Sequence, residues 1–483
     1  MPDLKEHSLS IPKPVPTNRR PSVPSSPMMS PASNTHPMSL YSRLAPPPLD
    51  LNNHHKLPST TATTTITTTI TTTTGTTTTT GTTTGTTTNN TTSQPLSPFL
   101  LSTEYIHELD HDTQHHPDPS FDICQSVPAF EIEIDHDNLL SGVATVIDSV
   151  FPEWEVDQDV RLVQCTNGIT NKLVRCTHAP TGNSVLVRTY GRGSGVLIDR
   201  EQELVNMLAL SRGGMCPPLH GRFTNGIVYG FTEGDVFSVS DMSDPYKSQL
   251  VAKHLAMWHN VTLPINRVPR LFHTLWRWLD AIPQTYSSTA KVSKFLDSGI
   301  SIGKLRSDLS LLQSHLEALN SPVVFCHCDL LSGNIIYSPK QDCVRFIDYE
   351  YGCYSYRGFD IANHFCEWAG FDCDWSMYPN EQQQKAWLST YWAESNYTAA
   401  VNYNPEARHN SPDTQLEATA PLSPEQLHNL YKEILKFSLA AHFFWAVWAL
   451  VQAEISDLDF DYLNYAVMRL DEYNRRKEDW LKL

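Results

Sequence analysis

The chain has 483 residues, and its 52 acidic residues against 35 lysines and arginines give a formal net charge of −17. Proteins that bind nucleic acid or anionic lipid broadly need clustered lysine and arginine, so this charge balance argues against both classes and favours a small basic or cationic ligand. The ten cysteines show no CxxC pair and no zinc-type spacing, which predicts free thiols in a reducing compartment.

The first quarter of the chain has a low-complexity composition. Residues 1–125 are rich in Pro, Ser, Asn and His, and residues 60–92 are almost entirely Thr. Such a segment cannot bury enough apolar surface to offset the entropy of ordering it, so we expect a disordered tail. Because threonine favours strands, aggregation or O-linked modification of this tail stays open. The N-terminus has no basic start followed by an apolar core, so we expect a cytoplasmic protein.

Residues 138–232 are predicted to form a small β-rich lobe with one helix, after a strand-like lead near residue 130. Three β-rich runs between residues 159 and 191 are separated by turn sequences, which suits an antiparallel meander. Residues 198–214 have the pattern of a helix that ends at a pair of glycines. Two short strands around residues 219–231 complete this lobe.

The hydrophobic spacing is mostly helical over residues 233–483, which predicts a larger second lobe and an α+β fold overall. Two short strands are expected within residues 323–351. Residues 402–423, rich in Ser, Pro, Asn and Glu, are predicted to be a disordered surface insert. The apolar run at residues 437–455 has an uninterrupted core shorter than the ~20 residues of a membrane span, so a buried helix is the favoured interpretation.

The main chemical pattern is "HCDLLSGN", in which an aspartate, Asp329, is followed five positions later by Asn334. This is the spacing of a kinase catalytic loop, where the Asp accepts a hydroxyl proton and the Asn oxygen ligates magnesium. The run "CVRFID" is predicted to be a strand ending in Asp348, whose carboxylate can chelate Mg²⁺ between two phosphates of ATP. One Asp before an Asn is most often a turn or a helix cap; the second acid and the flanking strands favour the kinase hypothesis.

A phosphate-binding loop has to be sought outside the Walker A pattern, which is absent from the sequence. The run "TNGITN" lies between two predicted strands, where backbone N–H groups and small side chains can approach phosphate oxygens. An ordinary hairpin turn explains the same run equally well. The candidate nucleotide contacts in this run are Asn167, Gly168, Thr170 and Asn171.

Arg188 is predicted to lie on a strand where a protein kinase carries lysine, and its guanidinium can serve as a permanent positive charge for phosphates. Glu203, with Glu201 as second choice, lies on the following predicted helix and is the candidate ion-pair partner of Arg188. A surface salt bridge of little consequence is the alternative.

Several of these runs, taken together, resemble the ethanolamine and choline kinase family. The resemblance rests on "NGITNKLV", "VLVRTYG", "FCHCDLLSGNIIY", "FIDYEYGCYSYRGFDIANHFCEW" and the run "HFFWAVWALVQAEISDLDFDYLNYAVMRLDEY", in this order from about residue 139 to the C-terminus. It covers neither the N-terminal tail nor the 402–423 insert. The family implies a protein-kinase-like fold with two lobes and the ATP-dependent phosphorylation of a small amino alcohol.

The resemblance also implies roles for single positions. Asp329 would be the catalytic base, Asn334 and Asp348 the magnesium ligands and Arg188 a phosphate contact. The adenine would contact the backbone around Gly230, Phe231 and Thr232, between the lobes. The chain departs from the family at Cys328, where the family usually has Asn between His and Asp. We expect catalysis to persist, because the following Asp and the downstream Asn are both retained.

An ammonium group is held by carboxylates that accept its hydrogen bonds and by aromatic faces that offer a negative quadrupole. Trp445 and Trp448 are three positions apart and share one helix face, which without the resemblance would be read as core packing. The resemblance implies substrate contacts at Tyr351, Glu367, Trp445, Trp448 and Tyr465.

Leu330 and Leu331 after the catalytic Asp resemble the ethanolamine branch, so we expect an ethanolamine kinase, acting in the first step towards phosphatidylethanolamine. The alternatives are a choline kinase or a dual-specificity enzyme, an aminoglycoside-type phosphotransferase, and a catalytically inactive binding or scaffold protein. The expected ligands are ATP, Mg²⁺ and a small-molecule substrate, ethanolamine or choline. We expect no nucleic acid and no stable membrane insertion, and a homodimer stays open.

Overall fold

A computed structural model describes residues 126–165, 171–191, 193–403 and 420–483 of the chain. All of these residues belong to one unit of the structure, Leu100–Leu483. The tail expected at residues 1–125 lies outside the described residues, and so do residues 404–419 of the expected insert.

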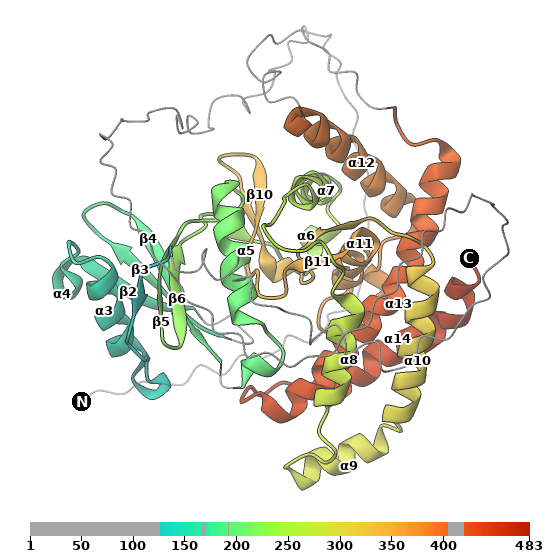
Figure 1. The fold of residues 1–483 in the computed structure, drawn as a ribbon, viewed down its shortest axis with the longest axis horizontal. Helices are drawn as coiled ribbons and strands as arrows, with labels where there is room; N and C mark the ends of the chain where they lie inside the picture. The colour runs from blue at the N-terminus through green and yellow to red at the C-terminus, as the bar shows by residue number, and fades with distance from the viewer. Residues whose placement is uncertain (1–125, 166–170, 192, 404–419) are drawn as a thin grey trace, which may run out of the picture. The chain divides into compact units, whose positions relative to one another are not determined.

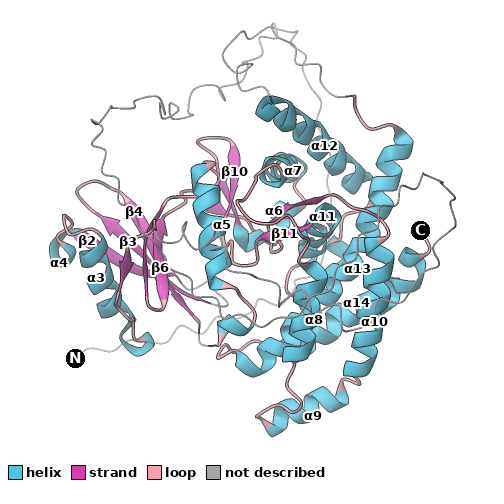
Figure 2. Cartoon of the chain, viewed as in Figure 1, coloured by secondary structure: helices cyan, strands magenta, loops and turns pink. Residues whose placement is uncertain are grey.

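The first lobe is built on a six-stranded mixed sheet (Figures 1 and 2). Its strands are β1 (Ala129–Phe130), β2 (Val160–Cys165), β3 (Asn171–His178), β4 (Ser184–Tyr190), β5 (Leu219–Phe223) and β6 (Gly226–Gly230). They lie in the order β1-β5-β6-β4-β3-β2, with β1 parallel to β5 and the other neighbours antiparallel. Because β1 is part of this sheet, the first lobe begins before residue 138, where the sequence placed its start.

Two longer helices, α3 (Leu139–Val150) and α5 (Arg200–Arg212), accompany this sheet, with one short turn of helix at α4 (Val156–Asp159). α3 buries Val143 and Val146 in a cluster with the strand residues Val174 and Val187. The buried residues of α5 belong instead to the main core, which continues into the second lobe. α5 ends before Gly214, which has a φ of +68°, as the sequence predicted for this pair of glycines.

The second lobe is mostly helical, in agreement with the hydrophobic spacing (Figure 2). Its helices are α6 (Val239–Met242), α7 (Pro245–His259), α8 (Leu271–Ala281), α9 (Thr289–Asp297), α10 (Ile302–Glu317), α11 (Arg357–Cys366), α12 (Glu381–Tyr403), α13 (Pro424–Ile455) and α14 (Tyr462–Leu481). α12 runs to Tyr403, and Ser423 forms a capping box with Gln426 at the start of α13. At the two ends of the expected insert, residues 402 and 403 therefore belong to α12 and Ser423 caps α13.

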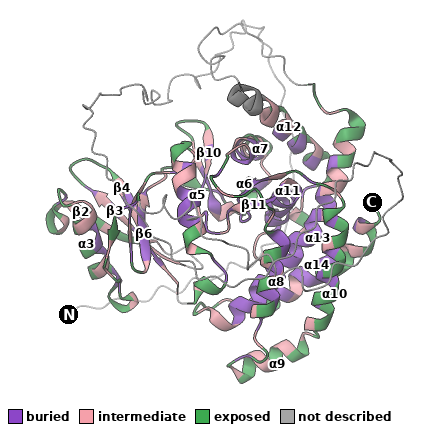
Figure 3. Cartoon of the chain, in the orientation of Figure 1, coloured by how far each residue is buried: buried purple, intermediate pink, exposed green. Residues whose placement is uncertain are grey.

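α13 is the central helix of the second lobe (Figure 3). It is long and apolar enough to cross a membrane by length and composition, but 94% of its apolar window is buried inside the protein. It packs against α11 and α14. The buried-helix interpretation of residues 437–455 is confirmed.

Short strands in the second lobe flank the loops that contain Asp329, Asn334 and Asp348. They are β7 (Asp235–Val236), β8 (Val323–Cys326), β9 (Ile335–Ser338), β10 (Cys343–Phe346) and β11 (Cys353–Tyr356). They form an antiparallel β10-β9-β7 sheet and an antiparallel β11-β8 pair. The prediction of two strands within residues 323–351 was wrong, because β8, β9 and β10 all fall there. β10 ends at Phe346, so Asp348 lies beyond the strand and not at its last position.

Candidate active site

A cavity of about 500 Å³ is lined by residues of β3, β4 and β6 from the first lobe and by loops, α13 and α14 from the second. The predicted site residues that line it are Asn171, Arg188, Phe231, Asp329, Asn334, Asp348, Tyr351, Glu367, Trp445, Trp448 and Tyr465. Glu203 and Gly230 are not part of its wall. Asn167, Gly168 and Thr170 lie outside the described residues.

The loop that carries Asp329 is tied to α11 through Asp360. The backbone N–H groups of His327 and Cys328 donate to the Asp360 carboxylate, at 2.8 and 2.7 Å. His259 of α7 bonds to the same carboxylate at 2.9 Å. Burial is the largest single effect on Asp360 and opposes its ionisation, but the contacts with His259 and His327 together outweigh it and hold the pKa of Asp360 below its usual value. Asp360 therefore holds the loop as a charged acceptor, a role that sequence reasoning missed.

His327 also holds this loop in place, through contacts of both its ring nitrogens with backbone groups. The Asp329 N–H donates to its Nδ1 at 3.3 Å, and its Nε2 lies 3.0 Å from the carbonyl oxygen of Ile347. This pattern assigns a neutral ring with the proton on Nε2. Burial lowers the pKa of His327 to about 4, which agrees with a neutral ring. The loop of Asp329 is thereby linked to the segment that carries Asp348.

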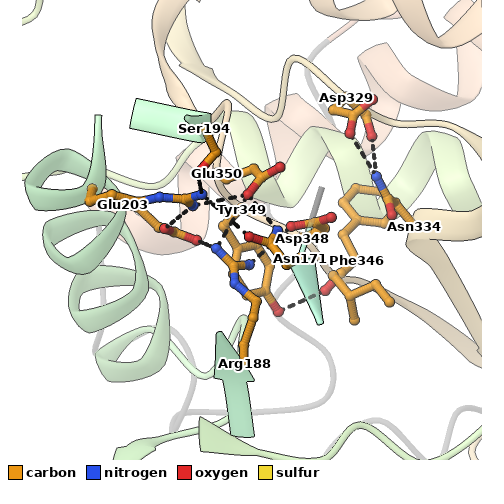
Figure 4. A network of polar contacts seen from close by, with 12 residues as sticks. Asn171, Arg188, Ser194, Glu203, Asp329, Asn334, Phe346, Asp348, Tyr349 and Glu350 are labelled. Carbon is orange, nitrogen blue, oxygen red and sulfur yellow. Dashed lines mark hydrogen bonds and ion pairs between the residues drawn. The ribbon is translucent and has the colours of Figure 1, made fainter. Parts of the chain in front are cut away.

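Asp329 and Asn334 face each other across this loop (Figure 4). The Asn334 side-chain NH₂ donates to the Asp329 backbone oxygen at 2.8 Å and to its Oδ2 at 3.0 Å. The second carboxylate oxygen, Oδ1, is buried and has no partner among the described residues. Burial raises the pKa of Asp329 well above its usual value, and the negative charge of Asp348 adds to the rise. An unpaired, basic carboxylate oxygen is what a group that accepts a hydroxyl proton requires.

Arg188 is buried and lies between the carboxylates of both lobes (Figure 4). It pairs with Glu203 of α5, and it reaches Asp348 at 3.1 Å and Glu350 at 3.4 Å. The pairing with Glu203 is the one expected from the sequence, and it is buried, so the alternative of a surface salt bridge was wrong. Glu203 thus pairs with Arg188 but does not itself line the cavity.

Glu350 joins the two lobes, and sequence reasoning missed it although it lies two positions after Asp348. Its Oε2 accepts from Arg200 at 3.0 Å and from the Asn171 side chain at 2.9 Å. Burial and the neighbouring Glu350 charge raise the pKa of Asp348 to about 7, against the opposing charge of Arg188. The Asp348 side chain keeps 32% of its surface exposed, and it lines the cavity.

In the stretch expected to contact adenine, two backbone N–H groups already donate hydrogen bonds within the protein. The N–H of Gly230 donates to Pro218 at 2.9 Å, and that of Phe231 donates to Ser184 at 3.2 Å. A Cβ on Gly230 would lie 2.9 Å from Pro217, so this glycine is required for packing. Phe231 and Thr232 line the cavity. Adenine contacts at the N–H groups of Gly230 and Phe231 are therefore not supported.

Another part of the cavity wall, which we call the aromatic end, is formed by aromatic rings. The rings of Trp445 and Trp448 are 5.3 Å apart and nearly perpendicular, and Tyr351 lies 5.7 Å from Trp445. Trp448 Nε1 donates to the Tyr351 hydroxyl at 2.8 Å, and Trp445 Nε1 donates to Asn363 at 2.7 Å. With their polar atoms satisfied, these rings are fixed and present apolar faces to the cavity.

Glu367 is the carboxylate at this aromatic end. Arg469 of α14 donates to its Oε1 at 3.0 Å and to the Tyr465 hydroxyl at 3.2 Å. Burial raises the pKa of Glu367, and the charge of Arg469 opposes that rise. Sequence reasoning missed Arg469, although its spacing of four residues from Tyr465 on one helix was visible.

The donors around the cavity fit a hard divalent cation. Asn334 and Asp348 offer oxygen atoms, and the unpartnered Oδ1 of Asp329 lies beside Asn334. Oxygen donors of this type suit Mg²⁺. A second group, His259, Cys326 and Asp360, is compact enough to ligate a metal but is buried. Its Asp360 oxygens already accept three hydrogen bonds, so this group is structural.

Comparison with known proteins places these features in one family. Residues 162–474 match the pattern of "Choline/ethanolamine kinase". The chain is 35% identical to "Probable ethanolamine kinase A" of Dictyostelium discoideum over 365 residues, 74% of this chain and 98% of that protein. It is 37% identical to "Ethanolamine kinase 2" of Rattus norvegicus over 360 residues, 73% of this chain and 85% of that protein.

Solved structures give the same fold. A Plasmodium vivax ethanolamine kinase superposes with a TM-score of 0.60 at 27% identity, covering 75% of this chain and 95% of that one. A choline kinase from Cryptosporidium parvum superposes with a TM-score of 0.54 at 20% identity, covering 70% and 96% of the two chains, and this likeness shows the fold alone. The expected α+β, protein-kinase-like fold with two lobes is confirmed.

Proposed function

Since the chain belongs to the choline/ethanolamine kinase family, and so is a kinase that uses ATP, we propose that it is an ethanolamine kinase. It transfers the γ-phosphoryl group of ATP to the hydroxyl of ethanolamine and forms phosphoethanolamine. One observation carries this proposal: the same cavity is lined by the Asp329–Asn334–Asp348 group and by a carboxylate, Glu367, that lies among aromatic rings.

Asp329 is the group that receives the substrate hydroxyl. Its Oδ1 is free of partners in the described residues, while Oδ2 is held by Asn334. The hydroxyl is thereby oriented towards the γ-phosphorus, and Asp329 takes its proton late in the transfer. Because the transition state of phosphoryl transfer is largely dissociative, positioning supplies most of the rate enhancement.

The phosphates of ATP lie between Arg188 and the oxygens of Asn334 and Asp348. Arg188 is held in place by Glu203 and can turn its charge from Asp348 to a phosphate oxygen. Asn334 and Asp348 would hold Mg²⁺, which neutralises charge on the phosphates when bound. The base of ATP packs against Phe231 and meets the backbone at Thr232, and the Asn171 side chain approaches the phosphates.

The ammonium group of the substrate lies at the aromatic end. Glu367 accepts a hydrogen bond from it, and Tyr351, Trp445, Trp448 and Tyr465 surround it. Choline is the second candidate substrate, because perpendicular aromatic faces can hold a quaternary ammonium that donates no hydrogen bond. The free thiols of all nine described cysteines support a reducing, cytosolic setting. A homodimer is a further part of the proposal, and light scattering of the purified chain measures it.

The test compares ethanolamine, its mono- and dimethyl derivatives and choline at one ATP and magnesium concentration, with the phosphorylated product identified by mass spectrometry. We expect the highest kcat/KM for ethanolamine. A higher value for choline would replace the proposal with the second candidate, and transfer to none of the four would refute both.

Asp329→Asn should lower kcat by about a hundredfold or more, because the hydroxyl loses its proton acceptor, while KM for ATP changes little. The same series of assays measures it. Unchanged turnover in this variant would show that Asp329 is not the catalytic base.

A further inference from the structure

Arg469 is a buried charge placed just outside the cavity. Arg469 is 0% exposed and is not part of the cavity wall. It nevertheless bonds to Glu367 and to Tyr465, and both of these residues line the cavity. Its Nη2 donates to the Ala441 backbone oxygen at 3.2 Å, which ties it to α13. Its guanidinium also lies over the Tyr465 and Trp375 rings, at 5.7 and 5.5 Å. The orientation of this guanidinium is therefore fixed from several sides.

The bond from Arg469 decides which oxygen of Glu367 is available. Oε1 accepts from Arg469 at 3.0 Å, whereas Oε2 makes no hydrogen bond within the described part of the chain. The carboxylate cannot rotate without losing a charge-assisted bond in a buried site. Oε2 is thus the oxygen left to meet a donor in the cavity.

Among the described residues, Arg469 is also the cation that faces Glu367. The other titratable groups near Glu367 are Tyr465 on α14, Cys366 on α11, Cys373 after the following turn and Asp329 on the catalytic loop. Burial raises the pKa values of Tyr465, Cys366 and Cys373, which keeps these groups neutral, and a negative Asp329 would only disfavour the Glu367 charge. Ionisation of Glu367 in its buried setting therefore depends on Arg469.

We propose that Arg469 is a positioning residue that sets the preference for a primary over a quaternary ammonium substrate, by holding Glu367 ionised with Oε2 turned to the cavity. This inference rests on the proposed function. A primary ammonium donates a hydrogen bond to Oε2, and that bond is strong only while the carboxylate is charged. A quaternary ammonium has no hydrogen to donate and is held by the aromatic faces, so it depends less on Arg469.

The test measures kcat/KM for ethanolamine and for choline in Arg469→Met. The ratio of the two values should fall by about tenfold or more, the size of one lost charge-assisted hydrogen bond. The change should appear in KM for ethanolamine, with KM for ATP unchanged. Arg469→Lys, which keeps the charge, should recover part of the ratio. Arg475→Met is the matched control, because Arg475 lies on the same helix with half of its side chain exposed, and its buried partner Glu472 keeps a second arginine, Arg476. This control should leave the ratio as in the parent protein.

The pH profile separates this role from a merely structural one. Glu367 acts when ionised, so kcat/KM for ethanolamine falls as the pH drops through the pKa of Glu367. Without Arg469 that pKa rises further, and the fall should begin at a higher pH in Arg469→Met than in the parent. A profile that does not move would overturn the inference.

Arg469→Met leaves Glu367 as an unpaired buried charge and can lower stability, so the double variant Glu367→Gln/Arg469→Met, which buries neither charge, completes the design. If Arg469 acts through Glu367, this double variant has the same substrate ratio as Glu367→Gln alone. A further fall in the double variant would contradict the inference. Failure of the parent protein to phosphorylate ethanolamine would instead refute the proposed function, so the two failures are distinguishable.

Discussion

At the scale of single residues, two residues of the site have a backbone conformation that most residues avoid. Cys328 has a φ of +65° and Asp348 a φ of +66°. Asp360 holds the first through the Cys328 N–H, and Arg188 bonds to the side chain of the second. Asparagine adopts the left-handed region more readily than most residues do. Asparagine would therefore suit this backbone better, and the cysteine is kept there by its surroundings.

Replacement of Cys328 should follow this backbone preference. Cys328→Val places a β-branched residue at positive φ and should lower the free energy of unfolding by about 1–2 kcal/mol. Cys328→Asn should cost less than Cys328→Val and keep the activity. Urea unfolding of both variants measures the difference, and equal stability of the two would show that the conformation of residue 328 does not limit the choice of side chain.

At the scale of elements, α11 connects the two ends of the site. It carries Asp360, which holds the catalytic loop, and Asn363, which holds Trp445, and Glu367 follows its last residue. α11 approaches α13 very closely at Gly358, where a Cβ would lie 2.5 Å from the Phe437 ring. A close fit of these two helices therefore sets the distance between the catalytic loop and the aromatic end.

Gly358→Ala should separate α11 from α13 and lower the free energy of unfolding by about 1–3 kcal/mol, as expected for overpacking a core. Gly303→Ala in α10 is the control, since the nearest atom to its Cβ would be Ser301 Oγ at 3.8 Å. That control should raise stability by about 0.5–1 kcal/mol, because alanine loses less entropy in a helix. Thermal unfolding compares the two, and a neutral Gly358→Ala would mean that the helices can adjust without cost.

At the scale of the whole described unit, charged contacts across the cavity join the lobes. Arg188 of β4 reaches Asp348 and Glu350, while Arg200 of α5 and Asn171 of β3 also reach Glu350. Glu350 is therefore the point where three groups of the first lobe meet the second. Together with the Arg188–Asp348 pair, this carboxylate holds the first lobe over Asn334 and Asp348.

Glu350→Gln should raise KM for ATP by about tenfold, because the two arginines lose a shared buried charge and the first lobe is held less firmly. KM for ethanolamine should change much less, since the aromatic end lies within the second lobe. Lys294→Met is the control, because Lys294 pairs with Asp461 at the surface of the second lobe and should leave both constants unchanged. Equal increases in the two KM values would argue against a role in joining the lobes.

Much of this protein follows from contiguous stretches of its sequence. The strands of the first lobe, α5, the buried α13 and the spacing of Asp329 and Asn334 are encoded within short windows, where hydrophobic period, turn residues and caps act locally. The number and the ends of the short strands around the catalytic loop were less predictable. A run of four residues is too short for its hydrophobic pattern to show where a strand begins and ends. The end of β10 before Asp348 was missed for this reason.

The partners of the site residues are what only the tertiary structure decided. Asp360 is 33 positions from His327, Arg469 is 102 from Glu367, and Glu350 is 162 from Arg188. The sequence determined which side chains are present and which of them are neighbours along the chain. Folding determined which charges face each other, which N–H groups are already used, and which carboxylate oxygens are left for a ligand, because these depend on packing between elements far apart in the chain.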